Sequence, residues 1–158
     1  MSTTNVVIAG LGGQGVLKAS DILADVAFSA GLDVKKADVH GMSQRGGSVS
    51  SDVRFGEHVF SPMVPTGSAD FLLVIAPDQV EVNRAALGAG GILIEPSVID
   101  EASLPNKKSL NVALLGALSC HLDFSVEAWT AAIKRNLPEK LHEANLQSFS
   151  LGRTAGKK

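Results

Sequence analysis

A glycine-rich turn, set between a short apolar run and an amphipathic segment, is the feature that most constrains the fold of this chain. The run VVIA, residues 6–9, has the continuous apolar character of a strand that is buried on both faces. The turn GLGGQG, residues 10–15, follows directly, and apolar residues then recur at helical spacing as far as an expected helix stop at Gly31. With a second strand predicted over Asp33–Val39, the chain begins as a βαβ unit.

The alternation of strands and helices is interrupted after this unit. A doubly wound fold would supply its next helix here, but the chain supplies a glycine-containing loop, HGMSQRGGS, residues 40–48. Two β-rich runs follow, on either side of Gly56 and Glu57, and they predict a hairpin. Strands over residues 70–76 and 92–95 come next, with a predicted helix between them that ends at the sequence GAGG.

The last third of the chain predicts helices throughout. One helix is capped by Ser125, the next segment accommodates Pro138 in its first turn, and the tail from Gly152 is expected to fray. These patterns predict an α/β fold, namely a Rossmann-like three-layer domain with a mostly parallel sheet, a β-hairpin insertion after strand two and a helical C-terminal third. Because no repeat or linker interrupts the sequence, residues 1–158 are expected to form a single domain.

Composition narrows the classes of function. The formal net charge is -2 and no cluster of basic residues stands out, so we expect no nucleic-acid partner. Cys120 is the one cysteine, which excludes a disulfide framework and an iron–sulfur cluster held by four thiolates of this chain. The longest apolar run, Phe71–Ala76, is far shorter than the roughly 20 residues of a membrane-spanning helix, and no secretory signal is visible. We therefore expect a cytoplasmic protein without a membrane partner.

The glycine turn itself admits two interpretations. Gly10, Gly12 and Gly15 satisfy the pattern G-x-G-x-x-G between a strand and a helix, and Asp38 near the end of the second strand is a candidate for the ribose-binding acid. This interpretation makes the chain a free-standing dinucleotide-binding module. The alternative is that the glycines allow a tight turn with close packing of the strand and the helix.

Residue patterns for catalysis or metal binding are missing. The sequence GMSQRG is one residue too long for a nucleophile elbow, and the histidines show no metal-ligand spacing on one helix. Cys120 and His121 are neighbours whose side chains point in different directions on a helix, so we interpret them as a buried thiol beside a partly exposed imidazole. Trp129 is expected to fill the core or an interface. The sequence therefore predicts neither a catalytic residue nor a metal site.

Two motifs together resemble a known family. GLGGQGVLKASDILADVAFSAGLDV, followed by HGMSQRGGSVSSDVRFGEHVFSPMVP, resembles the gamma-type component of the thiamine-dependent 2-oxoacid:ferredoxin oxidoreductases. The run H-G-M-x-Q-R-G-G-S is the narrower signal and is similar to indolepyruvate ferredoxin oxidoreductase beta subunits in particular. The likeness spans Asn5 to Leu151, although the chain is shorter than typical members around residues 97–110.

The resemblance implies a division of labour between subunits. A large partner subunit would bind thiamine diphosphate and iron–sulfur clusters, while this chain would hold no cofactor tightly. The complex would convert an aryl 2-oxoacid, CoA and oxidised ferredoxin to an acyl-CoA, CO2 and reduced ferredoxin. This chain would pack on the large subunit, help to complete the substrate and CoA environment, and be inactive alone.

Two segments are the candidates for that surface, the glycine turn and the loop after the second strand. Their residues are Gly12, Gly13, Gln14, Gly15, His40, Gly41, Met42, Gln44, Arg45, Gly46, Gly47 and Ser48.

Arg45 carries the main contact that we expect from this loop, a two-pronged bond to a carboxylate or a phosphate. Gln44 and Ser48 would add neutral hydrogen bonds, and His40 would cap or shuttle a proton. The alternative is a turn in which Arg45 pairs with a local acid such as Asp38 or Asp52. The sequence FSPMVP, residues 60–65, is interpreted as part of the same patch.

Overall fold

A computed structural model describes residues 3–157 apart from residues 41–46, and for His40 it describes the backbone alone. The strands of this part of the chain are β1 (Thr4–Leu11), β2 (Asp33–His40), β3 (Ser48–Gly56), β4 (Ala69–Val74) and β5 (Leu87–Ile94). Its α-helices are α1 (Val16–Ser29), α2 (Val80–Asn83), α3 (Leu110–Ser119), α4 (Val126–Asn136) and α5 (His142–Gly156). Short 3₁₀ turns fill much of the chain between β4 and α3.

The sheet has the strand order β2-β3-β1-β4-β5. β1 pairs in parallel with β4, and β4 with β5, whereas β3 is antiparallel to both of its neighbours, β1 and β2. Four strands therefore run in one direction and β3 runs against them. The prediction of an α/β fold with a mostly parallel sheet is confirmed, and the antiparallel strand occupies the place beside β1.

The predicted hairpin is wrong in its position. β3 is one continuous strand from Ser48 to Gly56, and Val59 and Phe60 belong to no strand. β3 forms the hairpin with β2, the strand that precedes it in the chain, so the two arms of the hairpin lie on either side of the loop of residues 40–48. Strand pairing ends at Gly56. Beyond it, the backbone N–H of Val59 donates a hydrogen bond to the side chain of Asp33, at Oδ2, over 2.8 Å.

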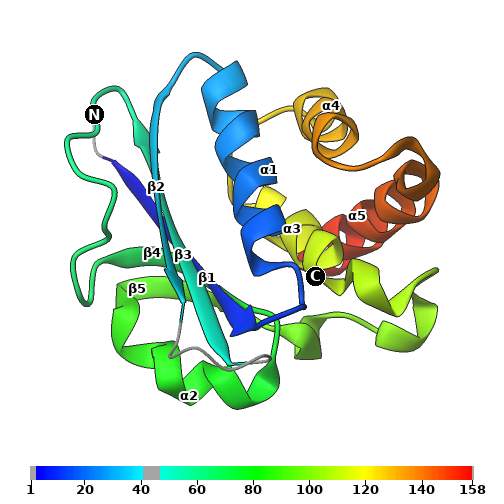
Figure 1. Cartoon of the computed structure of the whole chain (residues 1–158), viewed down its shortest axis with the longest axis horizontal. Coiled ribbons are helices and arrows are strands. Elements are labelled where there is room, and N and C mark those ends of the chain that lie inside the picture. The colour runs from blue at the N-terminus through cyan, green and yellow to red at the C-terminus, as the bar shows by residue number, and fades with distance from the viewer. Residues whose placement is uncertain (1–2, 41–46, 158) are drawn as a thin grey trace.

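Helices cover the two faces of the sheet unequally, as Figure 1 shows. α1 and α3 pack on one face, with α4 outside α1 and α5 outside α3, and residues 77–86, which include α2, lie against the other face. The larger core joins inward side chains of β1, β3 and β4 to the four helices, with Trp129 and Phe149 fully or almost fully buried at its centre. The three-layer prediction and the placement of Trp129 in the core are confirmed, but one of the helical layers is thin.

The predicted helix between the third and fourth parallel strands is mostly replaced by other structure. α2 has four residues between 3₁₀ turns, and β5 begins at Leu87, so the glycine run that was expected to end a helix lies inside the strand. The pairing register shifts between the pairs Ala69–Leu87 and Phe71–Ile92, which marks a bulge at these glycines. Position 91 requires glycine, because a Cβ there would lie 2.8 Å from the carbonyl oxygen of Ala69.

The predicted frayed tail is also wrong. α5 continues to Gly156, and a Cβ at Gly152 would overlap the carbonyl of Ala113 in α3. The small residues of the tail therefore allow two helices to pack closely, which a reading of composition alone misses. The predicted cap of α4 is confirmed, because the N–H of Ala128 donates to Ser125 Oγ at 3.1 Å.

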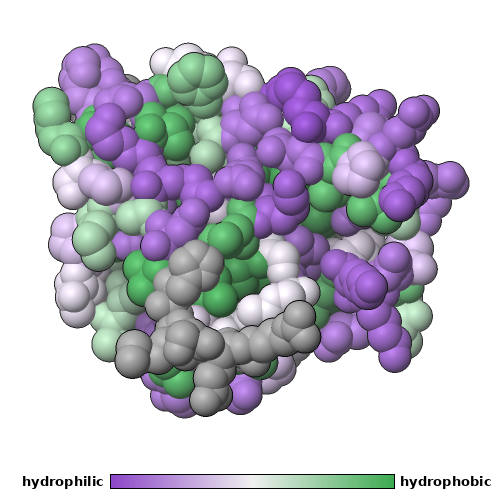
Figure 2. All heavy atoms as spheres, in the orientation of Figure 1, coloured by the Kyte–Doolittle hydropathy of each residue, from purple (hydrophilic) through white to green (hydrophobic). Residues whose placement is uncertain are grey.

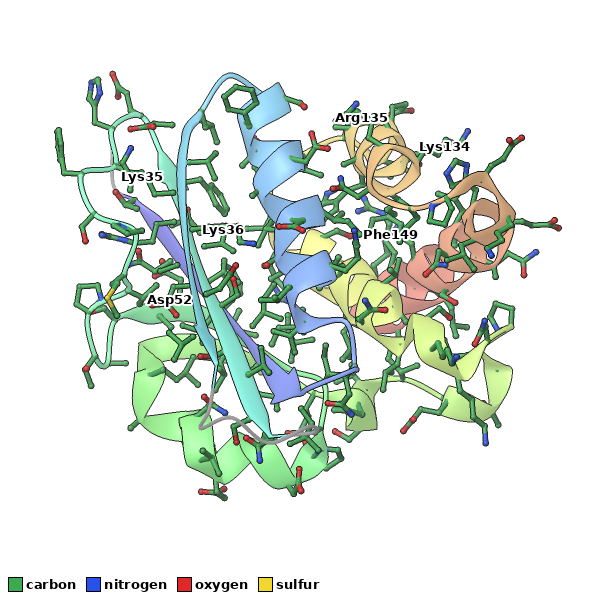
Figure 3. All side chains as sticks on the ribbon, in the orientation of Figure 1. Lys35, Lys36, Asp52, Lys134, Arg135 and Phe149 are labelled. Atoms are coloured by element: carbon green, nitrogen blue, oxygen red, sulfur yellow. The ribbon has the colours of Figure 1, made fainter. Side chains whose placement is uncertain are left out.

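Ion pairs join α1 to its neighbours. Arg135 in α4 donates through Nη2 to Asp25 Oδ1 at 2.7 Å, and this bond lowers the pKa of the Asp25 carboxyl from its ordinary value of 3.8. Lys36 reaches from β2 to Asp21 at 2.6 Å, whereas Lys35 lies on the opposite side of the strand (Figure 3). The outer surface over α4 and α5 is mostly polar in the view of Figure 2. No helix in the described part of the chain is long and apolar enough to cross a membrane.

Candidate functional site

The glycine turn between β1 and α1 is closed largely by its own groups. The N–H of Leu11 donates to Gln14 Oε1 at 2.8 Å, and the N–H of Gln14 donates back to the carbonyl of Leu11 at 3.1 Å. The side chain of Gln14 thus folds onto the end of β1. Gly10 makes room for it, because a Cβ there would lie 2.9 Å from Gln14 Oε1.

Two glycines of the turn take positive φ angles and meet different surroundings. Gly13 has φ of 89° and open space beside it, and Gly15 has φ of 81° at the start of α1. A Cβ on Gly15 would overlap Nδ2 of Asn111, in the first turn of α3. Gly15 is therefore required both by its backbone conformation and by the close approach of a second helix.

The structure brings the turn and the start of β3 together. The N–H of Gly12 donates to the carbonyl of Gly47 at 2.9 Å, and Ser48 Oγ donates to Gln79 Oε1 at 2.8 Å. The backbone of His40 pairs with Val49, one strand further along the same edge of the sheet. The predicted residues Gly12, Gly13, Gln14, Gly15, His40, Gly47 and Ser48 thus gather at one edge of the sheet.

The other predicted site residues are Gly41, Met42, Gln44, Arg45 and Gly46, and they lie outside the described residues. The pairing expected for Arg45, with an outside ligand or with a local acid, therefore stays a prediction.

Two further residues belong to this edge and were not predicted from the sequence. Asn111 is 6% exposed and donates through Nδ2 to the carbonyl of Gly15 at 3.1 Å, and Gln79 is 8% exposed beyond the end of β4. Each is a buried amide in otherwise apolar or turn-forming sequence. The available signal was Asn111 itself, the one strongly polar side chain in the run NVALLGAL.

A hollow of about 270 Å³ lies beside the turn, and its lining residues are Leu11, Gly12, Gly13, Gly15, Val16, Leu17, Lys18 and Val49. Lys18 is an exposed cation on the first turn of α1. The hollow therefore offers backbone amides, a helix start and the Lys18 amine, but no carboxyl, hydroxyl, thiol or imidazole group among the described residues that line it.

The dinucleotide interpretation fits this edge poorly. Asp38 lies on β2, and β3 separates that strand from β1, so the carboxylate is not on the strand next to the turn. Its Oδ1 already accepts from Ser51 Oγ at 2.6 Å and lies 3.2 Å from Lys36 Nζ. In the turn, the N–H groups of Leu11, Gly12 and Gln14 are bonded within the protein, which leaves fewer donors for a diphosphate.

Cys120 is bonded within the helical layer. Cys120 Sγ donates to the carbonyl of Arg153 at 3.2 Å, and no group of three or more metal-binding side chains gathers among the described residues. Cys120 is partly buried and His121 is exposed, with the imidazole ring 5.7 Å from Phe71. The two side chains thus have separate contacts.

The segment FSPMVP is not part of the glycine-turn surface, contrary to the prediction. It follows Gly56, which pairs with Asp33 at the opposite end of β3 from Ser48. Phe60 is 91% exposed and Met63 is 56% exposed. The segment is a separate surface that displays apolar side chains at some distance from the turn.

Comparisons with known proteins agree with this architecture. Residues 5–105 match the family model described as pyruvate ferredoxin/flavodoxin oxidoreductase. The chain is 49% identical to indolepyruvate oxidoreductase subunit IorB of Archaeoglobus fulgidus, with 94% of this chain and 92% of that protein covered. That alignment has 187 positions against the 158 residues of this chain, so the relative carries extra residues inside the aligned region.

Solved structures share the fold over nearly the whole chain. The gamma subunit of a keto/oxoacid ferredoxin oxidoreductase from Geobacter sulfurreducens PCA superposes with a TM-score of 0.83 at 22% identity, covering 99% of this chain and 98% of that one. A 2-oxoglutarate:ferredoxin oxidoreductase from Magnetococcus marinus, with 2-oxoglutarate, coenzyme A and succinyl-CoA bound, superposes with a TM-score of 0.85 at 18% identity. The fold covers 99% of this chain but 31% of that longer chain.

Proposed function

This chain belongs to the pyruvate ferredoxin/flavodoxin oxidoreductase family, and from that membership we propose that it is the gamma-type subunit of an indolepyruvate ferredoxin oxidoreductase. The complex would convert an aryl 2-oxoacid, CoA and oxidised ferredoxin to acyl-CoA, CO2 and reduced ferredoxin. The observation that carries the proposal is 49% identity to an IorB subunit over nearly the whole of both chains.

The division of labour forms the second part of the proposal. The described residues of this chain offer no cluster of metal ligands, and Cys120 is bonded within the helical layer. We therefore assign the iron–sulfur clusters and thiamine diphosphate to a large partner subunit, where the thiamine would supply the carbanion chemistry of decarboxylation. Ferredoxin would exchange electrons with that partner.

The glycine-turn edge is the surface that we assign to the shared active site. Gly12 and Gly13 are exposed in the turn, and they stand next to Gly47 and the exposed Ser48 at the base of the loop. The remaining loop residues, with Arg45 foremost, belong to the same proposal. The core joins strands near the start of the chain to α5, which supports the proposal that the chain forms one gamma-type domain.

The alternative is a free-standing dinucleotide-binding module that uses Gly10–Gly15. The position of Asp38 two strands from β1 and the internal bonding of three turn amides count against it. Isothermal titration calorimetry of the isolated chain separates the two. We expect no tight binding of NAD, NADP or FAD, and micromolar or tighter binding of any of them would favour the alternative.

Reconstitution tests the main proposal. The chain should be co-expressed with the large indolepyruvate oxidoreductase subunit of the same organism under anaerobic conditions. We expect the purified complex to reduce ferredoxin when indolepyruvate and CoA are both present, and each subunit alone to be inactive. Turnover by this chain alone, or full turnover by the large subunit alone, would contradict the assigned role.

A further inference from the structure

We propose that Asn111 is a positioning residue that fixes the glycine turn in the shape required by the assembled enzyme. The inference rests on the proposed function, because its consequence is read in the kinetics of the complex. Asn111 lies in the first turn of α3, 96 residues away in sequence from Gly15, whose carbonyl accepts its Nδ2 hydrogen bond at 3.1 Å.

Both Gly15 and Asn111 are suited to this contact. Gly15 lacks the Cβ that would occupy the place of Asn111 Nδ2, and the side chain of Asn111 is buried, with 6% of its surface exposed. The same Gly15 carbonyl accepts the N–H of Ala19 at 2.9 Å, the first helical hydrogen bond of α1. Asn111 therefore binds the carbonyl at which α1 begins and ties the starts of two helices together.

Among the described residues, the other hydrogen bonds of the turn do not join it to α3. The bonds between Leu11 and Gln14 are local, and the bond between Gly12 and Gly47 joins the turn to β3. Asn111 provides the side-chain bond from this turn to α3. Without it, the exposed Gly12 and Gly13 would keep their local shape and their link to Gly47, but the turn would lose its hydrogen bond to α3 and become more mobile relative to that helix.

A surface binds its ligand or partner less tightly when the position of its binding groups varies. Holding such groups within a fraction of an ångström is the ordinary task of supporting residues around a binding site. Because Asn111 touches neither the exposed glycines nor the hollow beside them, its loss should weaken binding and leave the chemical step, which is assigned to the partner, almost unchanged.

The chain offers a matched control in Asn145. This residue is 8% exposed in α5 and donates through Nδ2 to the carbonyl of Leu141 at 2.8 Å. Asn111→Asp and Asn145→Asp thus remove the same donor from the same type of bond at similar burial. Asn111→Ala and Asn145→Ala form a second pair that introduces no charge and serves if the aspartate variants fail to fold.

The first measurement is amide hydrogen exchange on the isolated chain. We expect the Asn111 variants to raise exchange at the turn and the first turn of α1, residues 11–19, beyond any global destabilisation, and the Asn145 variants to leave that segment protected. Equal protection of residues 11–19 in both sets would overturn the inference, and this result is independent of the proposed function.

The second measurement uses the reconstituted complex. We expect the Asn111 variants to raise KM for CoA or for the 2-oxoacid about fivefold or more, while kcat stays within about twofold of the unmodified complex. The Asn145 variants should change neither constant. Unchanged KM for both substrates in an active Asn111 complex would overturn the inference, whereas an unmodified complex without activity would instead contradict the proposed function.

Discussion

The glycine turn and the loop of residues 57–65 are both irregular segments, but the protein holds them in place by different means. The turn is closed mainly by its own backbone and by Gln14, with one hydrogen bond from Asn111 in α3 and with glycine required where the chain packs closely. The loop is held from outside by charged side chains of the adjacent strands. Asp33 accepts from the N–H of Val59, and Arg54 donates to the carbonyls of Ser61 and Met63 at 2.8 and 3.3 Å.

This difference determines which groups each segment exposes at the surface. A turn that is held through its backbone exposes backbone, as Gly12 and Gly13 do. A loop whose backbone is held by other residues is free to expose its own side chains, which is how Phe60 and Met63 come to lie at the surface on a fixed frame. The first arrangement suits close approach of a ligand and the second suits apolar contact.

The largest expected effect comes from breaking the turn with Gly15→Ala. The new methyl group would demand an unfavourable positive φ and would also overlap Asn111, so we expect a loss on the order of 3 kcal/mol in the free energy of unfolding. Urea denaturation measures it. Gly13→Ala is the control, since it has a similar φ in open space and should cost about 1 kcal/mol. Equal losses would mean that contact with Asn111 does not matter.

The next largest effect is expected from Asp52→Ala, which removes a hydrogen-bond acceptor that holds the loop of residues 57–65. Asp52 is 9% exposed and accepts the N–H of Val64 at 2.9 Å, so its removal leaves a partly buried donor without a partner. We expect a loss of about 1–2 kcal/mol in the free energy of unfolding by urea denaturation. Asp52→Asn keeps an acceptor and should lose less, and a larger loss in the asparagine variant would contradict this account.

The dependence of stability on pH distinguishes the two carboxylates that hold the loop of residues 57–65, Asp33 and Asp52. The bond from Val59 lowers the pKa of Asp33, so its contribution to stability is present above pH 3.8 and is lost as pH falls through the folded-state pKa. Burial raises the pKa of Asp52, so its contribution is full below pH 3.8 and is lost as pH rises through the folded-state pKa.

Unfolding of Asp33→Asn and Asp52→Asn at a series of pH values between 3 and 7 tests these signs. Relative to the unmodified protein, Asp33→Asn should become comparatively less stable as the pH rises, and Asp52→Asn comparatively more stable. The same trend in both variants would show that the two carboxylates do not hold the loop in the different environments described here.

The sequence predicted the structure correctly where residues close together in the chain determine it. The first βαβ segment, the stop at Gly31 and the cap at Ser125 depend on residues within a few positions of one another, and each was predicted. Gly12–Gly15 and Gly47–Ser48, which were grouped in the prediction, lie close together because β1 ends at Leu11 where its antiparallel partner β3 begins at Ser48. The resemblance to the oxidoreductase family supplied the functional prediction that periodicity could not.

The sequence was misleading where a partner far along the chain decides the structure. The pairing of β2 with β3 was missed because Lys36 and Asp38 point to the helical side of β2, which hides the alternation of a half-buried strand. Lys36 is accommodated there by Asp21 in α1. Asn111 escaped notice for the same reason, since its partner Gly15 is remote in sequence.

The smallest expected effect is that of Phe60→Ser on the free energy of unfolding. Phe60 is 91% exposed and stacks on the ring of His58 at a centroid distance of 6.3 Å, so its replacement removes almost no buried apolar area. We expect a change within about 0.5 kcal/mol by urea denaturation of the isolated chain. Phe55→Ser, at a phenylalanine that is 4% exposed in β3, is the control and should cost about 3 kcal/mol or more. A clear loss in Phe60→Ser would mean that the loop depends on its exposed side chains for its shape, and the contrast with the glycine turn would then fail.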